Sequence, residues 1–481
     1  MNLNKRIIRA MTLLLSLFFV LVLHLNYFII FESREYIEDV HNPRLYEVTR
    51  GTIYDRTGET ILAKSEGEAN LQKRVYPYGK LYAHVVGHFS REYGRSGIEK
   101  EYDSYLSANP TMLSVLYEKG KNVENKGQDL YLTIDHNLTS LVDKTVKSRF
   151  GSRKNANVIV MNPKTGEVYC AYSSKAFNPD VDEMKKVISK GERIDYRFDA
   201  VNNQFCPGST FKIITAASAI DNELEDYEIM DETGSINVGG AVFGNDKSKA
   251  MGKTDMRKAI VKSSNVYFTA ISKEIGRENM IETLDKFRVT KQIPFDGLNT
   301  IESGITILKR ERNSVQTVNL EECDTAAMAS VAFGQEPVKL SPLHMAMAVS
   351  AIANDGKMPT PYLVETSKRN GKVDYSAERA VLSRGCSERA ARLIRTYMVD
   401  CVEEGTGASA KISGFKFGGK TGTAQVEGKT AHAWYVGFAP ANNPQIAFCV
   451  MVENGGYGGS ACGPIVREII KYCRSSELIS E

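Results

Sequence analysis

The sequence predicts an α+β protein in which one antiparallel β-sheet is packed with helices, preceded by a membrane-spanning helix and a small extended module. Strand patterns occur at both ends of residues 128–481, around a middle with helical apolar spacing. This order favours one sheet covered by helices. Residues 10–31 are almost all apolar, and residues 32–127 are polar without long amphipathic periods. We therefore expect a short N-terminus (1–9), a membrane helix, a module at 32–127 that we call the pedestal, and the large domain.

Length and composition bound the possible functions. The chain has 481 residues, enough for two or three folded units. Its 61 basic and 58 acidic residues give a net charge of +3, and no long basic run is interleaved with aromatic residues, so nucleic acid is not an expected partner. The eight cysteines form no C-x-x-C pair and have no histidine at metal-ligand spacing. We expect buried free thiols, no metal and no cofactor.

The apolar run at residues 10–31 has the length that a helix needs to cross a bilayer, about 20 residues. Basic residues precede it and acidic residues follow it, so the positive-inside rule places residues 1–9 in the cytoplasm and exports the remainder. The alternative is a cleaved signal peptide. We favour an uncleaved, single-pass anchor because the run exceeds a usual signal core and lacks a small-residue cleavage site.

The pedestal is expected to begin with a hairpin, in which a strand within residues 50–58 turns into a returning strand at 60–63. In the large domain we expect helical structure from residue 209 to about 355. Strands are expected at 130–134, 158–161, 168–172, 420–425, 433–438 and 446–453, and further helices at 137–150 and 464–473.

Ser209 and Lys212 form an S-x-x-K motif at the start of an expected helix, since Pro207 and a glycine precede an apolar run. Their spacing places both side chains on one helix face. A neutral lysine in a desolvated pocket can take the proton of the serine hydroxyl, and the helix N-terminus favours negative charge there. Alone, the motif is a weak signal, because such pairs are usually a cap and a solvated lysine.

Ser263 and Asn265 form an S-x-N motif where small polar residues interrupt a helical stretch. A loop between two helices would direct both side chains toward the nucleophile. The Ser263 hydroxyl can relay a proton between Lys212 and a leaving amine, and the Asn265 amide offers a donor and an acceptor to a substrate peptide bond. Taken alone, an ordinary cap or turn is the more probable interpretation of this motif.

Lys420, Thr421, Gly422 and Thr423 lie on an expected strand that contains several glycines. Glycines on an edge strand let a second backbone approach, which suits a substrate lying antiparallel along that edge. The lysine and the two threonine hydroxyls would bind a terminal carboxylate. The backbone N–H of Thr423 would complete an oxyanion hole with that of Ser209.

Residues 414–421 also satisfy the G-x-x-x-x-G-K-[ST] pattern of a phosphate-binding loop. That motif requires a helix after the lysine, and the residues that follow form helices poorly. An exported domain also lacks a ready supply of nucleotide. We therefore favour the strand over the phosphate-binding loop.

The three motifs occur in one domain and in one order, and together they are a mark of penicillin-binding proteins and class A β-lactamases. Three individually weak signals therefore become a strong one. The chain closely resembles a class B penicillin-binding protein, a peptidoglycan D,D-transpeptidase, of a short type with one N-terminal anchor. The resemblance covers nearly everything after that anchor. Its further matches are at residues 50–58, 97–99, 133–135, 165–167, 342–346 and 434–438.

The resemblance implies a penicillin-binding/β-lactamase-like transpeptidase fold and a reaction. In this family the serine attacks the bond between two terminal D-alanines of a stem peptide, releases one, and passes the acyl group to an amine. β-Lactams acylate the same serine. The resemblance implies that Ser209 is this nucleophile. It also implies that the other seven residues of the three motifs act in catalysis or substrate binding. It also implies a place in the bacterial cell membrane with the catalytic domain outside, and a membrane glycosyltransferase as partner.

Two positions depart from the family pattern. Cys206 stands where an acidic residue is expected, and Glu336 stands where a glycine is usual. Neither position supplies a catalytic atom, so the two departures affect only the expected geometry of the local loops.

Other functions remain open from the sequence. A β-lactamase shares the motifs but needs a group that activates the deacylating water, and a pedestal and anchor do not serve it. A D,D-carboxypeptidase normally carries its serine close to the N-terminus, unlike Ser209. A catalytically idle scaffold or β-lactam sensor is a further alternative; the intact Ser209, Lys212 and Lys420 speak against an idle protein. The sequence does not distinguish elongation, division and sporulation.

Overall fold

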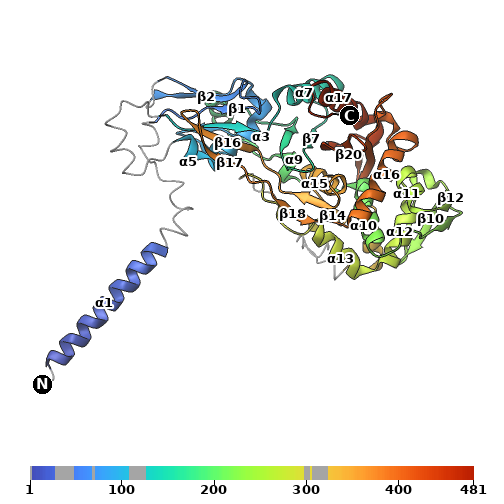
Figure 1. The fold of residues 1–481 in the computed structure, drawn as a ribbon, viewed down its shortest axis with the longest axis horizontal. Helices are drawn as coiled ribbons and strands as arrows, with labels where there is room; N and C mark the ends of the chain where they lie inside the picture. The colour runs from blue at the N-terminus through green and yellow to red at the C-terminus, as the bar shows by residue number, and fades with distance from the viewer. Residues whose placement is uncertain are drawn as a thin grey trace.

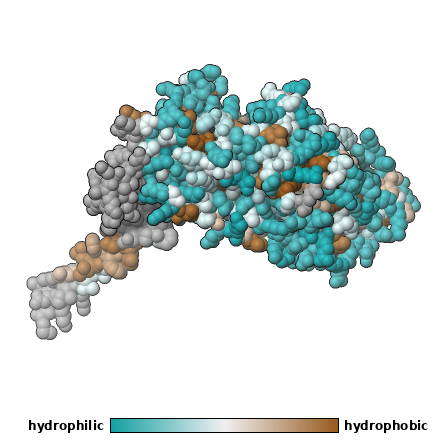
Figure 2. Space-filling view, turned by 45° about the horizontal axis from the view of Figure 1, so that its top comes forward, coloured by the Kyte–Doolittle hydropathy of each residue, from teal (hydrophilic) through white to brown (hydrophobic). Residues whose placement is uncertain are grey.

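The protein is described from a computed structural model over residues 3–27, 48–67, 71–107, 126–296, 304–305 and 323–480. Helix α1 runs from Leu3 to Tyr27. Its large apolar side chains between residues 11 and 23 are exposed, and they give the brown segment at the lower left of Figure 2. Among the described residues, no helix combines the length and the apolarity that crossing a membrane requires. Positions 28–31 of the expected membrane segment lie outside the described residues.

A five-stranded antiparallel sheet forms the centre of the large domain, as predicted. Its order is β19-β20-β21-β7-β8, so β19 lies at one edge. The strands are β7 (Ala156–Met161), β8 (Val168–Ser173), β19 (Gly418–Val426), β20 (Lys429–Ala439) and β21 (Ile446–Val452).

Both faces of this sheet are covered. Alternate residues of β20 enter two different cores: Trp434 and Val436 belong to one, and Tyr435 to the other. Helices α7 (His136–Phe150) and α17 (Gly458–Ser475) cover one face, and α15 (Pro342–Ala353) covers the other (Figure 1). Because both faces are buried, the inner strands are nearly continuous apolar runs.

Helix α17 begins at Gly458, six residues before the expected start at 464. Its first turns consist of small residues, which give no apolar period in the sequence. Close packing explains them, since a Cβ atom on Gly458 would lie 2.2 Å from the Trp434 carbonyl oxygen. The start of the helix therefore lies directly on the sheet.

The middle of the large domain is not helical throughout, so the expectation for residues 209–355 was wrong at the two-residue strands at 304–305 and 338–339 and at 229–254. Four short strands form two small antiparallel pairs there, β9 with β12 and β10 with β11. Turns that contain glycine follow β9 and β10, and a loop at 245–251 follows β11; the strands are too short to give a clear period of two. Their bounds are Ile229–Asp231 for β9, Ser235–Val238 for β10, Ala241–Gly244 for β11 and Gly252–Thr254 for β12.

The remaining elements of the large domain pack around these. Its helices are α8 (Val181–Ser189), α9 (Asp199–Asn202), α10 (Lys212–Asp221), α11 (Met256–Lys262), α12 (Asn265–Ile275), α13 (Arg277–Lys286), α14 (Thr325–Ala332) and α16 (Glu388–Glu404). The short strands are β13 (Gly304–Ile305), β14 (Val338–Lys339), β15 (Lys357–Pro359) and β18 (Val381–Arg384).

The pedestal shares a sheet with the large domain. Six strands pair in the order β17-β16-β6-β1-β2-β3, and the predicted hairpin of β1 with β2 is present. Strand β1 also pairs in parallel with β6. Strands that lie before and after the expected domain boundary at residues 127–128 therefore belong to one sheet (Figure 1). The bounds are β1 (Ile53–Tyr54), β2 (Ile61–Glu66), β3 (Lys73–Val75), β6 (Asp129–Leu132), β16 (Val364–Arg369) and β17 (Lys372–Ser376).

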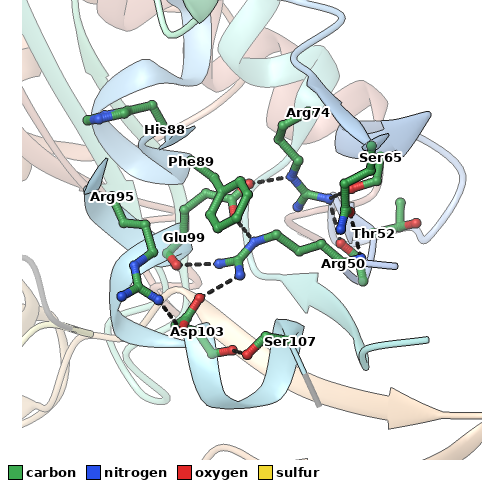
Figure 3. Close-up of polar contacts among 12 residues, drawn as sticks. Arg50, Thr52, Ser65, Arg74, His88, Phe89, Arg95, Glu99, Asp103 and Ser107 are labelled. Carbon is green, nitrogen blue, oxygen red and sulfur yellow. Dashed lines mark hydrogen bonds and ion pairs between the residues drawn. The ribbon is translucent and has the colours of Figure 1, made fainter. Parts of the chain in front are cut away.

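A buried ion network holds the pedestal together (Figure 3). The fully buried Glu99 carboxylate lies 2.6 Å from Arg50 Nε and 2.6 Å from Arg74 Nε, and Asp103 bridges Arg50 to Arg95. Burial alone would raise the pKa of Glu99, but Arg74 and Arg50 outweigh it and hold that pKa below its ordinary value. The network joins the expected hairpin strand at Arg50 to helix α4 (Gly97–Glu101).

We predict that Glu99→Gln destabilises the pedestal by about 3–5 kcal/mol, because two buried arginines lose their shared anion. The depressed pKa means that the carboxylate stabilises the fold above its unfolded pKa, about 4.3, and that this stability is lost as pH falls through the lower folded pKa. Amide hydrogen exchange of residues 50–107 in the full chain measures both effects.

The matched control is Glu66→Gln, which removes an exposed pair with Lys64 and should cost below about 1 kcal/mol. Equal protection of the pedestal in the two variants would show that the buried network contributes no more than a surface pair.

Candidate active site

The predicted nucleophile, Ser209, lies on a short 3-10 helix, η5 (Gly208–Phe211), and helix α10 begins directly after it at Lys212. The sequence predicted an α-helical start here. A 3-10 helix has three residues per turn, so side chains at i and i+3 lie above one another. Ser209 lies on this turn, three residues before Lys212, which is the first residue of α10. Ser209 is half-buried, and Lys212 is fully buried.

The Ser209 turn is locked between a loop and the edge strand. The Gly208 backbone N–H donates to the Gly334 carbonyl oxygen at 2.8 Å. A Cβ atom on Gly334 would lie 2.0 Å from the Gly208 oxygen, and one on Gly208 would lie 2.8 Å from the Thr423 oxygen. The φ angle is +55° at Gly208 and +80° at Gly334, values that residues other than glycine adopt rarely. The turn therefore sits directly against β19.

The two departures from the family pattern lie beside this turn. Gln335 reaches β19 through its side chain, whose Nε2 donates to the Thr423 oxygen at 3.4 Å. Glu336 is exposed, and Cys206 is buried. Burial raises the pKa of the Cys206 thiol to about 12, with a further contribution from Glu336. Cys206 is therefore a neutral thiol that takes no part in the ion pairs of the site.

The S-x-N motif lies between two helices, as predicted. Ser263 follows α11 in the left-handed conformation, with φ +62°, and Ser264 caps α12 by accepting from the Tyr267 N–H. Asn265 is the first residue of α12. This turn reverses the chain and places Ser263 and Asn265 on the same side as Lys212.

Lys212 meets this motif directly. Its Nζ lies 2.8 Å from the Ser263 carbonyl oxygen, 2.7 Å from Asn265 Oδ1 and 3.4 Å from Ser263 Oγ. Two of the three motifs are therefore in hydrogen-bond contact through one amine.

Lys420 connects the third motif to the same point. Its Nζ donates to Ser263 Oγ at 2.9 Å and to the Thr421 carbonyl oxygen at 2.8 Å. The Ser263 hydroxyl thus lies between the amines of Lys212 and Lys420. Lys212, Ser263, Asn265 and Lys420, with the Thr421 carbonyl oxygen, thus form one hydrogen-bonded cluster.

Both lysines titrate abnormally because of where they lie. Burial, followed by the charge of Lys420, lowers the pKa of Lys212 well below its ordinary value. Burial lowers the pKa of Lys420 to about 8. Two ammonium groups that share one hydroxyl in a buried site repel each other, which favours the neutral form of Lys212 relative to an exposed lysine.

The K-T-G residues lie on edge strand β19, as predicted. Thr421 Oγ1 donates to Thr406 Oγ1 at 2.7 Å, and Thr423 is half-buried. Gly422 allows close packing, because a Cβ atom there would lie 2.9 Å from the Pro207 oxygen. The strand continues through Thr423 to Val426, so no helix follows the lysine and the phosphate-binding loop is excluded.

Sequence reasoning missed two residues that hold the site together. Thr406 contacts the Thr421 hydroxyl, and Asn245 contacts the S-x-N turn through its side chain. Both lie in loops with no motif of their own, and their roles depend on contacts with distant backbone. Over the described residues, no cluster of three or more His, Cys, Asp or Glu side chains is placed to hold a metal.

Comparison with known proteins agrees with this geometry. A family model for the penicillin binding protein transpeptidase domain matches residues 156–471, and one for the penicillin binding protein A dimerisation domain matches residues 50–128. The peptidoglycan D,D-transpeptidase MrdA of Acinetobacter baumannii is 27% identical over 442 residues, which cover 81% of this chain and 64% of that relative. The peptidoglycan D,D-transpeptidase PbpA of Mycobacterium tuberculosis is 26% identical, over 98% of this chain and 100% of its own length.

A solved structure of penicillin-binding protein A from M. tuberculosis, as a ceftriaxone acyl-enzyme complex, superimposes with a TM-score of 0.80. It is 25% identical, and the match covers 89% of this chain and 99% of that one. Since the transpeptidase model covers more than half of its residues, the chain belongs to the penicillin-binding protein transpeptidase family.

Proposed function

We propose that this protein is a peptidoglycan D,D-transpeptidase that cross-links stem peptides through an acyl-enzyme on Ser209. The observation that carries the proposal is the meeting of Lys212, Ser263 and Lys420 beside the Ser209 turn. The substrate is a stem peptide ending in D-alanyl-D-alanine. This reaction is also the one named for the relatives from A. baumannii and M. tuberculosis.

In the acylation step, neutral Lys212 takes the proton of the Ser209 hydroxyl as Oγ attacks the carbonyl carbon between the two alanines. When the tetrahedral intermediate collapses, the C–N bond breaks and the leaving amine needs a proton. Ser263 Oγ lies between the two lysine amines and is placed to pass that proton on. In the second step, an amine from a neighbouring strand attacks the ester, and the same groups act in reverse.

The edge strand β19 offers the binding groups. A stem peptide lying antiparallel along it would place its terminal carboxylate near Lys420 and the hydroxyls of Thr421 and Thr423. The backbone N–H groups of Ser209 and Thr423 would form the oxyanion hole, which the packing of the Ser209 turn on β19 supports. Asn265 has one amide N–H left for the substrate, because its oxygen faces Lys212 and its other N–H faces Gly244.

β-Lactams present a strained amide and a carboxylate to the same groups, so they should acylate Ser209. The adduct should be long-lived, because an enzyme that passes its acyl group to an amine has no need to activate water. A β-lactamase would release it quickly, and an idle scaffold would form none. A β-lactam sensor would form the adduct but transfer no peptide.

We also propose that residues 10–31 anchor the chain in the bacterial cell membrane with the catalytic domain outside, beside a membrane glycosyltransferase that polymerises the strands. The apolar sequence of this segment and the charges on its two sides support the anchor. A reporter fused after Glu481 should be active only outside the cytoplasm, and activity confined to the cytoplasm would refute this topology.

We predict that a labelled penicillin leaves one covalent adduct, on Ser209, in the full chain, as mass spectrometry of tryptic peptides can show. Ser209→Ala should abolish the adduct and keep the fold, since Ser209 is half-buried and is not the cap of η5 or of α10. Thr423→Val should slow acylation without moving the adduct, because a partner of the carboxylate is lost. An adduct on another residue would contradict the mechanism.

A further inference from the structure

Asn245 supports the S-x-N turn from the outside. Its side chain is almost fully buried, and Oδ1 accepts from the backbone N–H groups of Asn265 at 2.8 Å and Val266 at 3.1 Å. Ser264 Oγ also lies 3.2 Å from this oxygen. The first N–H groups of a helix have no partner within the helix. Asn245 therefore satisfies two of the free N–H groups of α12, next to the cap that Ser264 provides.

The surroundings allow only one orientation of the Asn245 amide. Nδ2 faces Asp231 Oδ2 at 2.7 Å and the Lys249 carbonyl oxygen at 2.9 Å, and both of these accept only. The backbone N–H groups on the other side donate only. Asp231 is 2% exposed, and its carboxylate also accepts from the N–H groups of Gly234 and Met251. Asp231 therefore fixes Asn245, which fixes the turn.

The same segment also orients the Asn265 side chain. The carbonyl oxygen of Gly244, the residue before Asn245, accepts from Asn265 Nδ2 at 2.7 Å. A carbonyl oxygen cannot donate, so the Asn265 amide must turn its oxygen toward Lys212 Nζ, at 2.7 Å. Hydrogen bonds, together with the backbone of residues 244–245 and of Asn265, thus connect the Asp231 carboxylate to the amine that is proposed as the base.

We propose that Asp231 and Asn245 are positioning residues of the transferase reaction: they hold Asn265 with its oxygen on Lys212 and thereby set the proton affinity and the place of that amine. This inference rests on the proposed function. Neither side chain contacts Lys212, so both act through Asn265. The charged group that faces Lys212 directly is Lys420 on β19.

The contact between Asn265 Oδ1 and Lys212 Nζ determines in which direction the pKa of Lys212 should change. An oriented amide oxygen stabilises the charged form of Lys212 and so keeps its pKa from falling further. Without the Asn245 side chain, the start of α12 loses its link to the segment that carries the Gly244 carbonyl, so Asn265 shifts and Lys212 loses this acceptor. The neutral amine then persists to lower pH, while its place relative to Ser209 is less well fixed.

The test is the rate of acylation of Ser209 by a labelled penicillin, measured against pH. In Asn245→Ala the plateau rate should fall about tenfold or more, as expected for a misplaced base. The acidic limb, where the rate rises as Lys212 loses its proton, should move down by about one pH unit, the worth of one hydrogen bond to a charged group. Asp231→Asn keeps the shape of the pair but loses acceptors, so it should shift the limb in the same direction.

Ser341→Ala is the matched control, because it removes the cap of the buried helix α15 and leaves the S-x-N turn untouched. It should lower stability without moving the limb. If Asn245→Ala and Asp231→Asn slow acylation but leave the limb in place, the pair only stabilises the helix and the inference is wrong. If the wild-type chain forms no Ser209 adduct, the proposed function fails, and this inference with it.

Discussion

The site depends on one arrangement, in which the amines of two buried lysines both contact the hydroxyl of one serine. Lys212 and Lys420 are fully buried, and their Nζ atoms lie 3.4 and 2.9 Å from Ser263 Oγ. Two charged ammonium groups in this environment would repel each other and would both lose their hydration. The arrangement therefore favours the loss of a proton from one of the two amines. Burial and the charge of Lys420 lower the pKa of Lys212, which lies three residues after Ser209.

The fold provides this juxtaposition by bringing three distant elements together. Helix α10 carries Lys212, the turn between α11 and α12 carries Ser263, and the edge strand β19 carries Lys420. Covered on both faces, the five-stranded sheet gives β19 a fixed place. The glycines at 208 and 334 let the Ser209 turn pack on that strand without intervening side chains. Lys212 and Lys420 thus lie on regular elements, and among the described residues β19 pairs with a strand of this sheet only on its β20 side.

Much of this arrangement could be predicted from the sequence, because it follows from local patterns. The strands at 156–161 and 446–452 are apolar runs, and each motif has a fixed spacing on its own element. The parts that could not be predicted depend on contacts between distant residues. Asn245 has a role only because β11 ends beside α12, and the pairing of β1 with β6 joins segments that no sequence period connects. The four strands at 229–254 were missed for a different reason, since each is too short to produce a clear alternating pattern.

The most direct test of the account is the titration of Lys212 itself. With 13C-labelled lysine in the Ser209→Ala protein, which keeps the two amines in place, the Cε resonance of Lys212 reports its protonation against pH. Lys212→Met identifies the resonance. We expect a midpoint well below that of an ordinary lysine, about 10.4, and below that of Lys420. A midpoint near the ordinary value would mean that Lys212 is charged at neutral pH, and it would contradict its role as the base.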